Sequence, residues 1–134
     1  MLEKMFPMAV INAPPGLLKA LILKEASRAP LSAVKLIERI GERTGGIWKP
    51  SPGSIYYLTN ELESKGLLKK LKVEEERYPK YIITLKGKEE LENMVRASKK
   101  DVLKILTILK LYAEITEDKH LMQDLDNICK NIMF

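Results

Sequence analysis

Residues 48–68, WKPSPGSIYYLTNELESKGLL, carry the strongest structural signal in the sequence. Ser51 suits the N-cap of a helix because its hydroxyl can accept a hydrogen bond from a free backbone N–H, and Pro52 follows at the first helical position, which proline favours. Gly66 is typical of the residue that ends a helix. The segment therefore predicts a helix that begins at Ser51 and ends at Gly66. Its inward-facing apolar residues are Ile55, Leu58 and Leu62.

Two further helices are predicted before this segment. Apolar residues recur at helical spacing over residues 16–28, and Pro30 ends the pattern. Ser32 is the expected N-cap of a second helix over residues 32–43, which the glycines that follow interrupt. The residues predicted to face the core are Leu17, Leu18, Leu21, Ile22 and Ala26 in the first helix, and Val34, Ile37 and Ile40 in the second.

After Gly66 the apolar pattern changes to a period of about two residues, which is typical of strands. Two such runs, joined by Glu74-Glu75-Glu76-Arg77, predict a β-hairpin. The apolar residues assigned to one face of these runs are Leu67, Leu71 and Val73, then Tyr81, Ile83 and Leu85.

Helices are predicted again after the hairpin. Thr84 can cap a helix that starts near Leu85, and the sequence leaves open whether residues 97–100 interrupt it. A last helix is expected over about residues 117–132. The predicted fold class is mainly α with a small antiparallel β-hairpin (α+β). A winged helix-turn-helix domain over residues 1–88 is followed by C-terminal dimerisation helices over residues 89–134.

The charge of the chain is unevenly distributed. The 134 residues are 46% hydrophobic and 31% charged, which is ordinary for a globular protein, and the net charge is +5. Residues 1–88 carry 16 Lys/Arg against 9 Asp/Glu, whereas residues 89–134 carry 7 against 9. The first part therefore suits a polyanion such as DNA. A membrane surface is the weaker alternative because no basic amphipathic face appears.

The sequence offers no group of residues suited to catalysis. His120 and Cys129 are the only histidine and cysteine, so no zinc site and no internal disulfide can form from them. Ser51 and Ser54 have no neighbouring base that could activate them. We expect no enzyme activity, no metal and no cofactor. A reducing cytoplasm is the expected location because there is a single cysteine.

The order helix, helix, helix, hairpin is that of a winged helix, whose third helix lies in the major groove of double-stranded DNA. The start of this helix suits phosphate because its backbone N–H groups are free. The acidic wing tip, Glu74-Glu75-Glu76, would be repelled by phosphate, so contacts are expected from its flanks. The residues assigned to DNA are Ser51, Gly53, Ser54, Tyr56, Tyr57, Asn60 and Lys65, and on the wing Lys72, Arg77 and Lys80.

The sequence resembles the PadR family of phenolic-acid-type transcriptional regulators over about residues 17–91. The likeness rests on TGGIWKPSPGSIY at residues 44–56, the leucine spacing after it, and YIITLKG at residues 81–87. It implies a dimer that binds a palindromic operator, often released by a small-molecule effector. It also implies that Ser51, Gly53, Ser54 and Tyr56 lie at the DNA. The turn LSAVK at residues 31–35 departs from the usual LHGYE of the family, so contacts there are expected to differ.

Two residues remain open to more than one interpretation. Trp48 could be a stacking platform for a planar aromatic ligand, but its place in the turn before the third helix favours packing. Asn60 could read adenine, but the sequence does not place it at a base edge.

The apolar stripes of the C-terminal helices predict a homodimer interface, because a small winged helix has little free surface on which to bury them. The residues assigned to it are Leu91, Val102, Ile105, Leu109, Tyr112, Leu121, Leu125, Ile128 and Ile132. The expected function is that of a repressor that binds DNA. The alternative is a winged helix that binds other proteins of the transcription or chromatin machinery, for which the acidic wing tip is the main argument.

Overall fold

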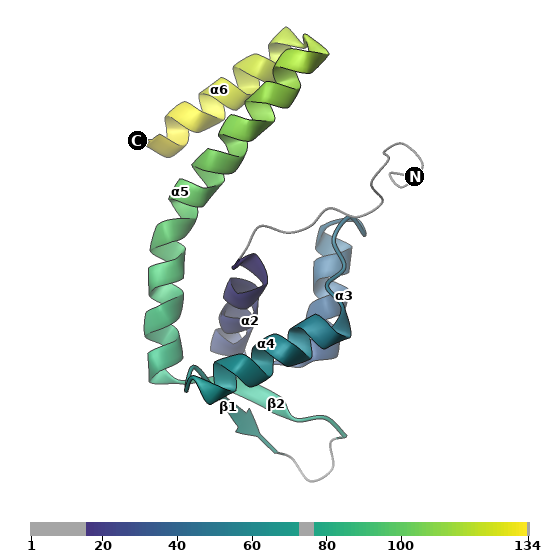
Figure 1. The fold of residues 1–134 in the computed structure, drawn as a ribbon, viewed down its shortest axis with the longest axis vertical. Helices are drawn as coiled ribbons and strands as arrows, with labels where there is room; N and C mark the ends of the chain where they lie inside the picture. Colours follow the sequence, from purple (N-terminus) through teal and green to yellow (C-terminus); the bar gives the residue numbers. More distant parts are fainter. Residues whose placement is uncertain (1–15, 73–76, 134) are drawn as a thin grey trace. The chain divides into compact units, whose positions relative to one another are not determined.

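The computed structural model describes residues 16–72 and 77–133 (Figure 1). It divides into two compact units, Met1–Leu91 and Glu92–Phe134. The elements in chain order are α2 (Leu17–Arg28), α3 (Ala33–Arg43), α4 (Pro52–Ser64), β1 (Leu68–Leu71), β2 (Lys80–Ile83), α5 (Leu85–Thr116) and α6 (Lys119–Met133). The predicted fold, mainly helical with one small antiparallel hairpin, is confirmed.

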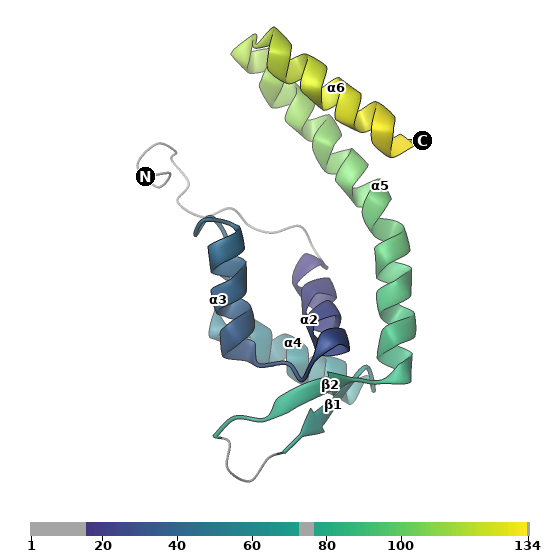
Figure 2. The ribbon, with the colours of Figure 1, turned by 180° about the vertical axis from the view of Figure 1, so that it is seen from behind.

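Three helices and the hairpin enclose the core of the first unit. Figure 2 shows the hairpin running beneath α2 and α4. Thr59 is fully buried although it is polar, and its hydroxyl donates to the backbone oxygen of Tyr56 at 3.0 Å. The predicted apolar stripe of α4 is therefore confirmed at Ile55 and Leu62, and Thr59 lies between them in the core. The core side chains are Ile22, Leu23, Ala26, Leu31, Leu36, Ile40, Ile55, Leu62, Leu67, Leu68 and Tyr81.

The prediction for the inner face of α3 is wrong at its first residue. Val34 is 49% exposed, whereas Leu36 and Ile40 are 3% and 5% exposed. The Ser32 side chain caps the helix as predicted, accepting from the Lys35 N–H at 3.5 Å. Val34 therefore lies in the first turn, and the side of the helix that meets the core runs through Leu36 and Ile40.

The prediction for the hairpin face is wrong at Leu71 and Leu85, which are 38% and 75% exposed. Leu67 does not belong to the strand, because its N–H donates to the Leu62 oxygen at 2.9 Å and so completes the end of α4. Strand alternation therefore starts at Leu68, which pairs with Ile83 and points inward. Leu85 is the first residue of α5, outside the second strand. Val73 lies outside the described residues.

A short bridge ties the start of α3 to β2. The Leu31 N–H donates to the Tyr81 oxygen at 2.7 Å, and the Tyr81 N–H donates back to the Leu31 oxygen at 3.3 Å. Both side chains are buried. The N-terminal end of α3 is consequently held beside the wing, even though 50 residues separate the two in sequence.

The second unit contains most of α5, from Glu92 onward, and all of α6. Ala113, Leu125 and Cys129 are buried between these helices, and the Lys110 ammonium lies 2.7 Å from the Asp126 carboxylate. Their hydrogen bond lowers the pKa of Asp126 and raises that of Lys110. The chain is helical through residues 97–101, which answers the question left open by the sequence. Asp118 caps α6 by accepting from the N–H of Leu121 at 3.1 Å.

The junction between α4 and α5 leaves no room for a side chain at Gly87. The Thr84 hydroxyl donates to the Gly66 oxygen at 2.6 Å and accepts from the Gly87 N–H at 3.0 Å. A Cβ at Gly87 would lie 2.1 Å from the Leu67 oxygen and 2.7 Å from Cγ1 of Ile83. The first turn of α5 is thus packed directly on the backbone that ends α4.

We expect Gly87→Ala to lower the free energy of unfolding by about 3 kcal/mol, because the added methyl group meets backbone that cannot move freely. Gly41→Ala is the matched control. Gly41 lies inside α3, and no atom lies within 4 Å of the place that its added methyl group would take, so this change should stabilise the protein by about 0.5–1 kcal/mol. Urea unfolding followed by circular dichroism measures both. Equal stability of the two variants would contradict the packing at Gly87.

Candidate nucleic-acid interface

The N-terminal end of α4 is an exposed polar surface. The Ser51 side chain accepts from the Ser54 N–H at 3.1 Å, which confirms the predicted N-cap, and the two hydroxyl oxygens lie 2.8 Å apart. Pro52 has no N–H to satisfy. Gly53 is exposed, and a methyl group there would meet only the Ser51 hydroxyl, at 4.0 Å. Nothing within the described chain covers this end of the helix or demands a glycine in it.

The exposed face of α4 lies opposite its buried stripe. Tyr57 is 69% exposed and Asn60 is also exposed, whereas Ile55 and Thr59 have no exposed surface. The predicted separation of a core face from a free face on this helix therefore holds at Ile55, Tyr57 and Asn60, and Thr59 joins the core face without having been predicted.

One flank of α4 is connected to the hairpin by polar contacts. The hydroxyl of the buried Tyr81 donates to Oδ1 of Asn60 at 3.4 Å, and the Lys70 ammonium lies 3.8 Å from the Glu63 carboxylate. The same ammonium lies 6.0 Å from the centre of the Tyr81 ring. Bidentate reading of adenine by an asparagine needs both its oxygen and its nitrogen. The Asn60 oxygen has two lone pairs, so it can accept from Tyr81 and still accept from a base.

Lys65 lies at the opposite end of α4 from Ser51 and is already paired. Its ammonium lies 2.7 Å from the Glu61 carboxylate, one helical turn earlier. The hydrogen bond between them lowers the pKa of Glu61 and raises that of Lys65. The pairing is therefore kept as pH falls until the lowered pKa of Glu61 is reached. A phosphate at Lys65 would have to share the ammonium with this carboxylate.

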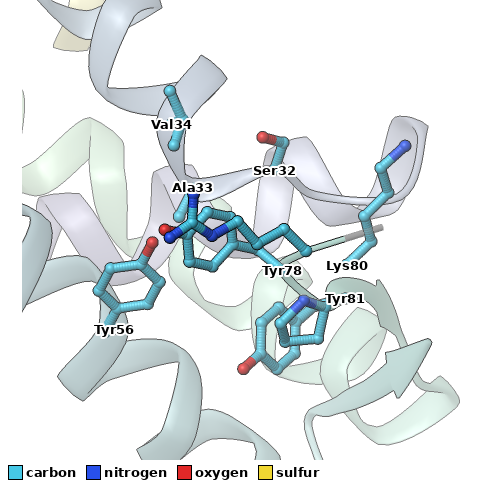
Figure 3. Close-up of a pocket in the computed structure, with 9 residues that line it drawn as sticks. Ser32, Ala33, Val34, Tyr56, Tyr78, Lys80 and Tyr81 are labelled. Atoms are coloured by element: carbon cyan, nitrogen blue, oxygen red, sulfur yellow. The ribbon is translucent and has the colours of Figure 1, made fainter. Parts of the chain in front are cut away.

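A groove of about 220 Å³, here called the wing groove, brings the wing, α4 and the start of α3 together. Figure 3 shows Tyr56 of α4 and Lys80 of β2 on opposite sides of it, with Ser32 and Ala33 between them. The first backbone N–H groups of a helix lack partners within the helix and attract anions. The complete lining is Ser32, Ala33, Val34, Tyr56, Arg77, Tyr78, Pro79, Lys80 and Tyr81.

The wing groove adds residues that the sequence did not assign to the site. Tyr56, Arg77 and Lys80 were assigned to DNA and are brought together, but Ser32 and Ala33 were assigned only to the helix start. The N-cap pattern at Ser32 predicted the start of a helix, where the first backbone N–H groups have no partners within the helix. Its place beside the wing depends on the bridge between Leu31 and Tyr81, which no local pattern reveals.

The remaining residues of the predicted site differ in their surroundings. Arg77 stacks on Tyr78, with its guanidinium 5.6 Å from the ring centre, and Lys72 is exposed next to β1. The acidic tip, Glu74-Glu75-Glu76, lies outside the described residues. Trp48 is half-buried, and its backbone N–H and oxygen both bond to the Thr44 hydroxyl at 3.2 Å.

The described residues contain neither a metal-binding cluster nor a membrane span. Within residues 16–72 and 77–133, no three His, Cys, Asp or Glu side chains are grouped so that they could hold a metal ion. None of the helices described in those ranges is both long and apolar enough to span a bilayer.

Known proteins share this fold. The model of the transcriptional regulator PadR-like family matches residues 22–93. The chain is similar to a transcriptional regulator from Clostridium thermocellum, with 22% identity and a TM-score of 0.61 over 71% of this chain and 97% of that one. It is also similar to a candidate transcriptional regulator from Thermoplasma acidophilum, with 27% identity and a TM-score of 0.60 over 70% of this chain and 90% of that one. A PadR-like transcription factor from Bacteroides fragilis shares 24% identity with the chain, with a TM-score of 0.54 over 70% of this chain and 90% of that one. No curated protein matches the chain.

We expect Ser51→Ala to lower the free energy of unfolding by about 1 kcal/mol, because the Ser54 N–H loses its partner at the start of α4. Ser54→Ala is the matched control. It removes an equally exposed hydroxyl but leaves the cap in place, so stability should change by less than about 0.5 kcal/mol. Thermal unfolding of both variants measures the difference. A larger loss in Ser54→Ala than in Ser51→Ala would contradict the assigned cap.

Proposed function

Because the chain belongs to the PadR-like family of transcriptional regulators, we propose that it binds double-stranded DNA sequence-specifically as a homodimer. It would act in the cytoplasm on a palindromic operator, mainly as a repressor. Repression follows if the bound dimer blocks access to a promoter, and a small effector would relieve it by favouring a conformation that releases DNA. The family membership supports regulation of transcription, and the details of operator, effector and direction are proposals.

The observation that carries DNA binding is the position of the wing groove beside the exposed face of α4. In a winged helix the third helix enters the major groove. With Tyr57 directed at the bases, the neighbouring phosphates would approach the wing groove, where the free end of α3 and the Arg77 guanidinium favour negative charge. Tyr56 would donate its hydroxyl to the same backbone.

The homodimer rests on apolar surface in the second unit. Leu125 is only 8% exposed and contributes to packing between α5 and α6, so it offers little to a partner. Most of the other residues assigned to the interface remain open, and Ile108, Leu111 and Ile115 add to them. Large exposed apolar surfaces mark interaction sites. The exposed apolar residues from Val102 onward are Val102, Ile105, Ile108, Leu109, Leu111, Tyr112, Ile115, Leu121 and Ile128.

Selection of bound fragments from the host genome tests DNA binding and the operator together. We expect enrichment of inverted repeats whose half-sites are separated by about 10 base pairs or a multiple of this, as two-fold symmetry requires. If about 6 to 10 phosphates are neutralised, affinity should fall about 10³- to 10⁵-fold between about 50 and 200 mM salt. Arg77→Ala should weaken binding, whereas Arg43→Ala, an arginine outside the wing groove, should not.

A flat response to salt, or equal binding by the two arginine variants, would overturn this assignment of the DNA surface. Recovery of protein partners without enriched DNA would instead support a winged helix that binds proteins of the transcription machinery.

We expect Ile108→Glu to weaken self-association by about 100-fold or more, because the dimer would bury a charge that has no partner. Ile108 is 57% exposed in the single chain, so the substitution should leave the fold intact. Gln123→Glu adds the same charge at an exposed polar position of α6 and is the control. Sedimentation velocity at several concentrations measures both. A wild-type protein that stays monomeric, or a variant that associates normally, would contradict the interface.

A further inference from the structure

A second groove is lined in part by Leu31, the residue that pairs with Tyr81 in the bridge. This groove, here called the turn groove, has a volume of about 200 Å³ and lies where the turn between α2 and α3 meets β2. None of the described residues that line it belongs to α4. Its charged lining residues are Glu25, Arg28, Lys35, Arg39 and Lys80.

The turn groove is strongly cationic. Its lining holds four basic side chains and one carboxylate, and that carboxylate, Glu25, forms an ion pair with Arg39. Arg28 and Lys35 therefore add positive charge to the lining beyond this pair. Arg28 and Lys35 are both exposed, so their charged ends remain in water and can reach a ligand without a large desolvation penalty.

The two grooves are neighbours that share lining residues. Ser32 and Lys80 line both of them, and the first turn of α3 lies at the point where they meet. Lys35 lies one helical turn from Arg39 on α3, so it places a positive charge beside the ion pair of Arg39 with Glu25. A linear polyanion that lies in the wing groove can therefore continue into the turn groove without meeting an unpaired carboxylate among the lining residues.

We propose that the turn groove binds a second stretch of the DNA backbone, beyond the phosphates reached from α4 and the wing. This inference rests on the proposed DNA binding and extends the contact surface to the turn between α2 and α3. The occupant is a nucleic-acid backbone, and a small free anion is the less suitable ligand. Arg28, Lys35 and Arg39 are long, exposed side chains, whereas a small anion is held best by converging, buried donors.

The salt dependence of binding tests this contact. The full chain is titrated against a duplex that carries a genomically selected site, with fluorescence anisotropy at several KCl concentrations. Each lost phosphate contact should reduce the slope of log K against log[salt] by about 0.9. In the proposed homodimer each substitution removes two contacts, so Lys35→Ala and Arg28→Ala should each reduce the slope by about twice this amount. Lys88→Ala is the control, because Lys88 is an exposed lysine of the same unit that lines neither groove.

The outcomes separate this inference from the proposed function. If the wild-type protein binds with a steep salt slope but Lys35→Ala and Arg28→Ala keep that slope, the turn groove makes no contact and the inference fails alone. If the wild-type protein binds no DNA, both fail. In a second arm, inorganic phosphate is compared with chloride at equal ionic strength. A rise in Tm that Lys35→Ala abolishes, with an unchanged DNA slope, would identify a small-anion site and overturn the inference.

Discussion

The surface assigned to DNA depends on how Tyr81 is held. Its backbone pairs with Leu31 in both directions, its ring is buried beneath Lys70, and its hydroxyl reaches Asn60. One residue of β2 thereby positions the start of α3, a residue of β1 and one flank of α4. Without the pairing to Leu31, the first N–H groups of α3 would have no fixed place beside the wing, and neither groove would keep its lining.

The boundaries of the helices could be predicted from the sequence because caps are local. Ser32 and Ser51 each accept from a backbone N–H three residues later, and Thr84 does the same at the start of α5. The inward faces were harder to predict. The errors at Val34 and Leu71 arose because the phase of a short helix or strand is set by tertiary packing, and four-residue strands give too few residues to reveal it.

The candidate site was predictable as a set of residue types but not as an arrangement. The exposed face of α4 follows from helical periodicity, which is why Tyr57 and Asn60 were assigned to it. The engagement of Asn60 by Tyr81 joins residues 21 positions apart, and the wing groove joins segments still further apart. Contacts of this kind depend on how the helices and strands pack against one another. Composition and residue spacing are local features, so they do not reveal that packing.

The hydrogen bond between Tyr81 and Asn60 restricts how the Asn60 side chain can turn. An amide oxygen has two lone pairs, so Oδ1 can accept from the Tyr81 hydroxyl and from a base at the same time, while the amide nitrogen donates. Adenine presents the matching N7 acceptor and N6 donor in the major groove. If Asn60 lies at a base edge of the proposed DNA surface, Tyr81 would hold its amide in one orientation before DNA arrives. Less side-chain entropy would then be lost on binding.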